Sequence, residues 1–129
     1  MNLSVHSLYF SYQAAPLLRD LDFSLDTGSF VCVLGKNGAG KSTLFQCILN
    51  LQKNYTGMIS LDGQNVKALK EKELAKSIAY IPQLHKQSFP FSVFDTVLMG
   101  TAASLSPFST PKEAQKEAAM EALHLMGCL

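Results

Sequence analysis

Apolar and polar positions alternate along two stretches near the start of the chain. Residues 3–10 show the alternation, and residues 18–25 repeat it through Leu21, Phe23 and Leu25. This period is typical of strands with one buried face. Residues 30–34 are apolar throughout, which predicts a strand covered on both faces in a parallel sheet.

A helical period follows a glycine-rich stretch at residues 35–40. From Ser42 onward, Leu44, Ile48 and Leu51 fall on one face of a helix. The sequence therefore predicts a unit of strand, loop and helix over residues 30–51.

Two further strands are predicted in the middle of the chain. Residues 57–61 predict a short strand, and Asp62-Gly63 after it predicts a type I′ turn, because both central residues need positive φ. Residues 78–81 predict another apolar strand, ended by Pro82.

The last third of the chain predicts helices. Residues 93–100 favour a short one. A longer helix follows, with Thr110 as its cap, Pro111 in its first position, Glu113 completing a capping box and Gly127 at its end. Strands and helices together indicate an α/β fold.

Composition and charge fit one soluble cytoplasmic domain. The 129 residues are 47% hydrophobic and 16% charged, which is enough to build a core. A net charge of +1 gives no general argument for a nucleic-acid partner. Neither an apolar run long enough to span a membrane nor a signal-peptide pattern is present in the sequence.

One motif in the sequence predicts a phosphate-binding site. Residues 35–42, Gly-Lys-Asn-Gly-Ala-Gly-Lys-Ser, fit the Walker A phosphate loop G-x-x-x-x-G-K-[ST]. Glycines let the backbone curl so that several N–H groups meet phosphate oxygens together, and the following helix N-terminus favours anions. Lys41 supplies a positive charge for the β- and γ-phosphates, and the Ser42 hydroxyl suits Mg²⁺.

The run Leu-Gly-Lys-Asn-Gly-Ala-Gly-Lys-Ser-Thr at residues 34–43 closely resembles the loop of ABC transporter ATP-binding domains. Residues 9–12 and 17–21, the hairpin at 57–63 and the run Ile-Ala-Tyr-Ile-Pro-Gln at 78–83 resemble other segments of that family. Residues 89–93 and 97–100 resemble its importers of iron–siderophores, haem and vitamin B12. The resemblance implies an incomplete ABC-type P-loop NTPase, the N-terminal portion only.

The resemblance also implies a site and its ligands, ATP and Mg²⁺. Tyr12 would stack on adenine, Gln83 of the Q-loop would contact Mg²⁺ or the attacking water, and Ser42 would be the other metal ligand. The residues expected to bind the nucleotide are Tyr12, Gly35, Asn37, Gly38, Ala39, Gly40, Lys41, Ser42, Thr43 and Gln83.

Domains and partners follow from the same resemblance. Residues 1–83 would be part of the ATP-binding core, and residues 84–129 would begin the helical subdomain. Residues near 89–97 would dock on a permease, a second ATP-binding subunit would complete a homodimer, and no nucleic acid is expected. The protein would lie on the cytoplasmic face of the cell membrane.

The signature loop, the Walker B acidic pair and the switch histidine of the family are not in the sequence. We therefore expect no catalytic residue here, with hydrolysis only in an intact protein and poor stability for a truncated chain. The transported substrate is expected to be an iron-siderophore or a related metal chelate. The alternatives are a non-catalytic nucleotide- or permease-binding module from a truncated reading frame, or a small P-loop kinase.

Overall fold

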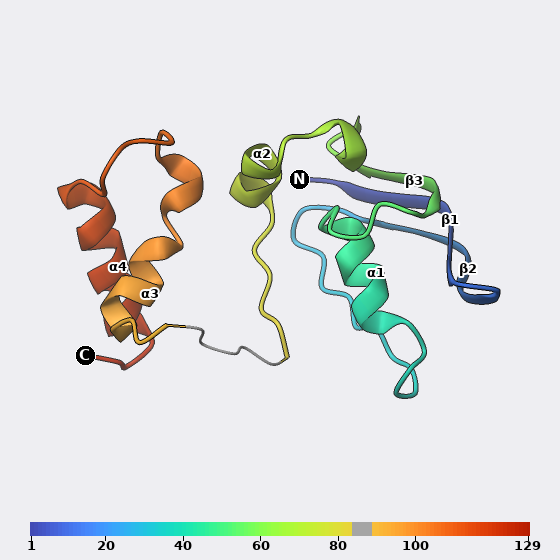
Figure 1. Cartoon of the computed structure of the whole chain (residues 1–129), viewed down its shortest axis with the longest axis horizontal. Helices are drawn as coiled ribbons and strands as arrows, with labels where there is room; N and C mark the ends of the chain where they lie inside the picture. Colours follow the sequence, from blue (N-terminus) through green and yellow to red (C-terminus); the bar gives the residue numbers. More distant parts are fainter. Residues whose placement is uncertain (84–88) are drawn as a thin grey trace. The chain divides into compact units, whose positions relative to one another are not determined.

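The computed structural model describes residues 1–83 and 89–129, and Figure 1 shows their course. The chain forms two compact units, Met1–Leu74 and Ala75–Leu129. The boundary between them falls inside the short helix α2 (Glu71–Ser77). Across the described ranges, none of the helices has the length and apolar character that crossing a membrane would require.

The first unit is built on an antiparallel sheet of four strands. They are β1 (Leu3–Tyr12), β2 (Ala15–Leu25), β3 (Thr56–Leu61) and β4 (Gln64–Asn65), in the order β2-β1-β3-β4. The strands predicted at residues 3–10, 18–25 and 57–61 are therefore confirmed, each with slightly wider bounds.

Strand β1 keeps one face buried through a change of register. Leu3 and Val5 are buried at a spacing of two, and so are Leu8 and Phe10. The pairing with β2 shifts between Val5 and Leu8, where Ser7 adopts a φ of 46°. The extra residue of this bulge returns the later side chains to the core face.

The hairpin between β3 and β4 has the geometry that its sequence predicts. Asp62 has a φ of 49° and Gly63 a φ of 80°, so both central residues adopt positive φ as a type I′ turn requires. The return strand is only two residues long. Val66 follows that strand, begins the 3-10 turn η1 (Val66–Ala68) and is fully buried.

Helix α1 (Lys41–Ile48) supplies the helical part of the first unit's core. Its residues Leu44 and Ile48 are buried on one face, as the sequence predicts, and Cys47 is buried with them. The prediction of Leu51 on the same face is wrong, because the helix ends at Ile48 and Leu51 is 71% exposed. The buried hydrophobic residues of this unit are Leu3, Val5, Leu8, Phe10, Leu18, Leu44, Cys47, Ile48, Tyr55, Ile59, Leu61, Val66 and Leu74.

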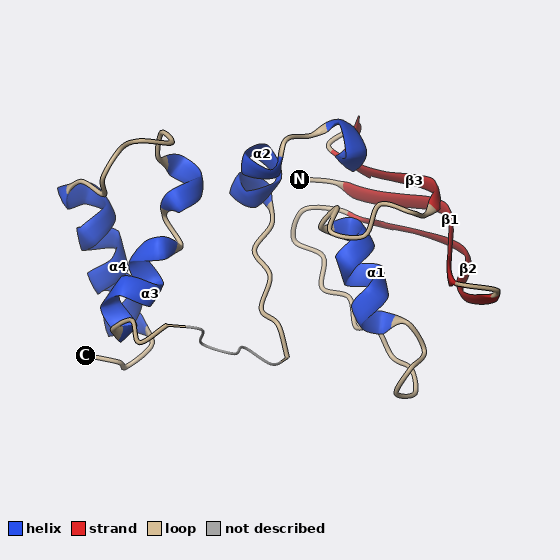
Figure 2. Ribbon diagram, viewed as in Figure 1, coloured by secondary structure: helices blue, strands red, loops and turns tan. Residues whose placement is uncertain are grey.

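Two predicted strands are wrong. Residues 30–34 and 78–81 form no strand, and Figure 2 draws the chain before α1 and after α2 as loop. Phe30 and Leu34 are each 90% exposed, and Ile81 is 92% exposed. A strand needs a neighbour to take up its backbone hydrogen bonds, and none of the four sheet strands pairs with these residues.

The second unit contains α3 (Val93–Met99), the short turn η2 (Ala102–Ser104) and α4 (Glu113–Leu125). The helix predicted at residues 93–100 is confirmed, and the Ser92 hydroxyl caps it by accepting from the Asp95 N–H at 3.0 Å. Helices α3 and α4 pack together, with Ala119 and Leu123 of α4 buried.

The predicted start of α4 is wrong by two residues. Thr110 and Pro111 precede the helix, and Lys112 occupies the cap position. The Gln115 Oε1 atom accepts from the Lys112 backbone N–H at 3.1 Å. This bond satisfies a backbone donor at the helix start, the job that the sequence assigns to Glu113. At the other end Gly127, with a φ of 67°, follows the helix as predicted.

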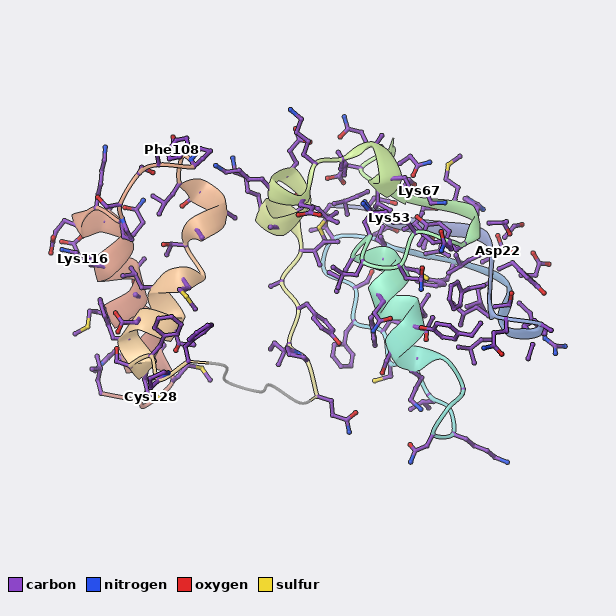
Figure 3. The ribbon with its side chains drawn as sticks, viewed as in Figure 1. Asp22, Lys53, Lys67, Phe108, Lys116 and Cys128 are labelled. Atoms are coloured by element: carbon purple, nitrogen blue, oxygen red, sulfur yellow. The ribbon has the colours of Figure 1, made fainter. Side chains whose placement is uncertain are left out.

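Tyr55 lies in the segment between the end of α1 and the start of β3. Its ring is buried beneath the ammonium of Lys67, 3.9 Å from the ring centroid, and the same Lys67 Nζ donates to the Tyr55 carbonyl at 3.0 Å. Figure 3 shows Lys67 on the sheet side of this unit. The phenol oxygen is buried with no hydrogen-bond partner in the described part of the chain. Burial, and secondarily the nearby Cys47, raise the pKa of Tyr55 to about 12.

We predict that Gly57→Ala strongly destabilises the first unit. Gly57 has a φ of 90°, and an added Cβ would lie 2.3 Å from the Ser7 carbonyl oxygen and 2.5 Å from that of His6. Backbone strain and overlap together should cost about 2 to 4 kcal/mol of unfolding free energy, measured by urea denaturation.

Gly63→Ala is the matched control. Gly63 has a φ of 80° but open space around it, so its cost should be about 1 to 2 kcal/mol. Equal costs for the two variants would contradict the packing of Gly57 on the bulge.

We predict that stability falls between pH 10 and pH 12 because of Tyr55. The unfolded chain releases this proton near the ordinary pKa of 10.0, whereas the folded chain holds it until about 12. The free energy of unfolding therefore keeps its full value below pH 10 and declines as the pH rises toward 12. Denaturant titrations across this range should show a shallower decline for Tyr55→Phe, which retains the ring under Lys67. Identical pH profiles for the two proteins would contradict the buried phenol.

Candidate functional site

The predicted phosphate loop is a tight turn that leads into α1. The Ala39 N–H donates to the Lys36 carbonyl at 3.1 Å and closes the turn. Gly38 adopts a φ of 82° and Gly40 a φ of 101°, both in the left-handed region that glycine tolerates. The chain therefore reverses direction within a few residues before the helix begins at Lys41.

Gly40 is the point at which the loop rests on the sheet. It is buried, and a Cβ at this position would lie 2.9 Å from Leu18 Cδ2 and 3.0 Å from Leu17 Cγ. Both leucines belong to β2. Any larger residue would push the loop away from β2, so glycine is required here by space as well as by its φ.

Lys41 folds back over the loop. Its Nζ atom donates hydrogen bonds to the Gly35 carbonyl and, at 3.0 Å, to the Lys36 carbonyl. These two bonds hold a positive charge at the entrance of the loop, although Lys41 itself is the first residue of α1.

The start of α1 presents backbone donors. The Leu44 N–H makes the first bond of the helix, to the Gly40 carbonyl at 2.9 Å. The N–H groups of Lys41, Ser42 and Thr43 come before that bond. In this described stretch the helix has no side-chain cap and no acidic residue in its first turn. Uncapped donors and the helix dipole favour an anion here.

The residues of the loop fit a phosphate group and a bound magnesium ion. The glycines allow the close turn, Lys41 supplies charge, and Ser42 is exposed with a hydroxyl oxygen of the kind that Mg²⁺ prefers. Asn37 is exposed at the turn, and Thr43 is buried beneath it. The structure thus gathers the loop residues 35–43 of the predicted set at one place.

Tyr12 and Gln83 lie apart from the loop in the sequence. Tyr12 is the last residue of β1, its ring is 52% exposed, and it meets the Phe10 ring edge-on with centroids 4.7 Å apart. It belongs to the same compact unit as the loop. Gln83 is exposed and belongs to the second unit.

Sequence reasoning missed the support beneath the loop. A cavity beside Lys41 is lined by Leu17, Leu18, Arg19, Leu21, Val33, Leu34, Ala39, Gly40, Lys41 and Leu44. The alternation of Leu21, Phe23 and Leu25 would place Leu18 on the opposite face, and a shift in the pairing of β1 with β2 brings it to the buried one. No local signal pairs Leu18 with Gly40. Within the described ranges, no group of three or more His, Cys, Asp or Glu side chains is placed to hold a metal ion.

The sequence matches the ABC transporter family over residues 18–129. It is 39% identical over 123 residues to an ABC transporter ATP-binding protein of Haemophilus influenzae, covering 95% of this chain and 47% of that protein. It is 42% identical over 113 residues to a Helicobacter pylori protein named "Probable iron chelatin transport ATP-binding protein", covering 87% of this chain and 44% of that one.

A solved structure agrees with these relatives. The chain superposes on a metal-chelate type ABC transporter in an inward-facing conformation with a TM-score of 0.75 and 33% identity. The match covers 98% of this chain and 44% of the solved one, so the chain spans about half the length of the proteins that it matches. Because the family match extends over most of its residues, this chain belongs to the ABC transporter family of ATP-binding proteins.

Proposed function

We propose that residues 35–43 bind the phosphates of Mg-ATP. The observation that carries this proposal is the geometry of the loop. Gly40 seats the turn on β2, Lys41 lies across the carbonyls of residues 35 and 36, and α1 begins with uncapped N–H groups. Each of these features favours the binding of a polyanion.

The metal would be held by oxygen ligands. The Ser42 hydroxyl is exposed at the helix start, and Gln83 would add its side-chain oxygen from the Q-loop. Bound Mg²⁺ would neutralise part of the phosphate charge. The roles of Ser42 as ligand, of Gln83 as sensor and of Tyr12 as adenine platform are parts of this proposal.

We propose that an intact ABC ATP-binding protein with this segment serves an ABC importer. A relative named for iron chelatin transport and a metal-chelate type transporter among the solved structures support a metal-chelate cargo. Hydrolysis would need the signature loop, the Walker B carboxylates and the switch histidine, for which this sequence offers no substitute. This chain would therefore contribute nucleotide binding and no catalytic residue.

A permease would dock on the second unit. Phe89 and Phe91 are 65% and 47% exposed, and their ring centroids lie 5.9 Å apart. Phe91 also lines an apolar groove with Leu98, Met99 and Leu105. Exposed apolar patches of this kind mark protein contacts. We place the docking surface at residues 89–97, in a helical subdomain that begins at residue 84, and the protein as a dimer on the cytoplasmic face of the membrane.

We predict that Lys41→Ala weakens Mg-ATP binding about 10- to 100-fold, because a charge-assisted contact to phosphate is lost. Isothermal titration with Mg-ATP measures this effect. Lys112→Ala, which removes a lysine from the second unit, is the control and should leave the affinity unchanged. If Lys41→Ala binds Mg-ATP as well as the parent chain does, the proposed site is wrong.

We predict that Tyr12→Ala weakens Mg-ATP binding roughly tenfold, because the aromatic surface under the base is lost. The same variant should bind inorganic triphosphate, which has no base, with the affinity of the parent chain. Tyr12→Phe should retain Mg-ATP binding, since the ring face remains. Equal losses for Mg-ATP and for triphosphate would show that Tyr12 supports the fold instead of the base.

A further inference from the structure

In the segment that contains the loop, all of the charged residues are basic. Residues 29–61 include three lysines, Lys36, Lys41 and Lys53, and neither aspartate nor glutamate. The whole chain has a net charge of only +1, so the positive charge is concentrated around this segment. The Lys41 side chain is accounted for by the proposed phosphate contact, whereas the side chains of Lys36 and Lys53 have no role assigned in it.

Lys36 stands at the turn itself. Its carbonyl oxygen accepts both the Ala39 N–H at 3.1 Å and the Lys41 Nζ at 3.0 Å. A carbonyl oxygen lies about 2.4 Å from its own Cα, so the Lys36 Cα lies within about 5 to 6 Å of the Lys41 ammonium. The Lys36 side chain is exposed and forms no ion pair with any residue that the structure describes.

We propose that Lys36 is a second cationic residue at the phosphate end of the site and favours triphosphates over diphosphates. This inference rests on the proposed function, because it presumes that phosphates occupy the loop. A terminal phosphate brings added negative charge toward the loop entrance, where both ammonium groups can reach it. Coulomb attraction grows with that charge, so a nearby lysine strengthens triphosphate binding more than diphosphate binding.

The test compares Mg-ATP with Mg-ADP affinity in K36Q. The ratio of the two affinities should fall about three- to tenfold relative to the parent chain, mainly through weaker Mg-ATP binding. K36R keeps the charge and should keep the ratio. Raising the salt concentration should lower the ratio of the parent chain more than that of K36Q, because the added contact is exposed and screened.

Two matched variants locate the effect. K53Q removes the same charge after the end of α1, away from the loop, as Figure 3 shows, and should leave the ratio unchanged. K112Q removes a lysine from the second unit and should also leave it unchanged.

An unchanged ratio in K36Q, or an equal fall in K53Q or K112Q, overturns the inference while the proposed nucleotide site stands. If the parent chain binds neither nucleotide, both the inference and the proposed function fail.

Discussion

Gly40 is the constraint on which the candidate site depends. Its left-handed φ of 101° turns the chain into α1, and a Cβ at this position would lie 2.9 Å from Leu18 Cδ2 and 3.0 Å from Leu17 Cγ of β2. Only glycine therefore lets the turn approach β2 this closely. The same residue accepts the first hydrogen bond of the helix through its carbonyl. One position therefore sets the direction of α1, the height of the loop above the sheet and the orientation of the uncapped N–H groups.

The rest of the first unit holds that position in place. β2 carries Leu17 and Leu18, and β1 fixes β2 through a long antiparallel ladder. β1 in turn is fixed to β3 where Gly57 packs against the bulge at Ser7. At the far end of α1, Tyr55 lies beneath the Lys67 ammonium. A phosphate-binding loop must be preorganised to meet several oxygens together, and this chain of contacts supplies the rigidity.

Local features could be predicted from the sequence, and features that need a distant partner could not. The type I′ turn at Asp62-Gly63 and the loop at residues 35–42 follow from backbone preferences of a few residues. Residues 30–34 and 78–81 are predicted to be strands because they are apolar. A strand also needs a neighbouring strand to take its backbone hydrogen bonds, and no strand of the described sheet pairs with these residues. Helix α4 begins after Lys112 and not after the predicted cap Thr110, and the Gln115 side chain accepts the Lys112 backbone N–H there. The contact of Gly40 with β2 joins residues more than twenty positions apart, and no local pattern encodes it.

The central claim is that the backbone N–H groups at the start of α1 bind phosphate. The most direct measurement follows the amide resonances of ¹⁵N-labelled chain while Mg-ATP, and separately inorganic triphosphate, is added. The account predicts that the largest shifts occur at Gly38, Gly40, Lys41, Ser42 and Thr43 with both ligands. Shifts confined to other segments, with these five amides unmoved at saturation, would contradict it.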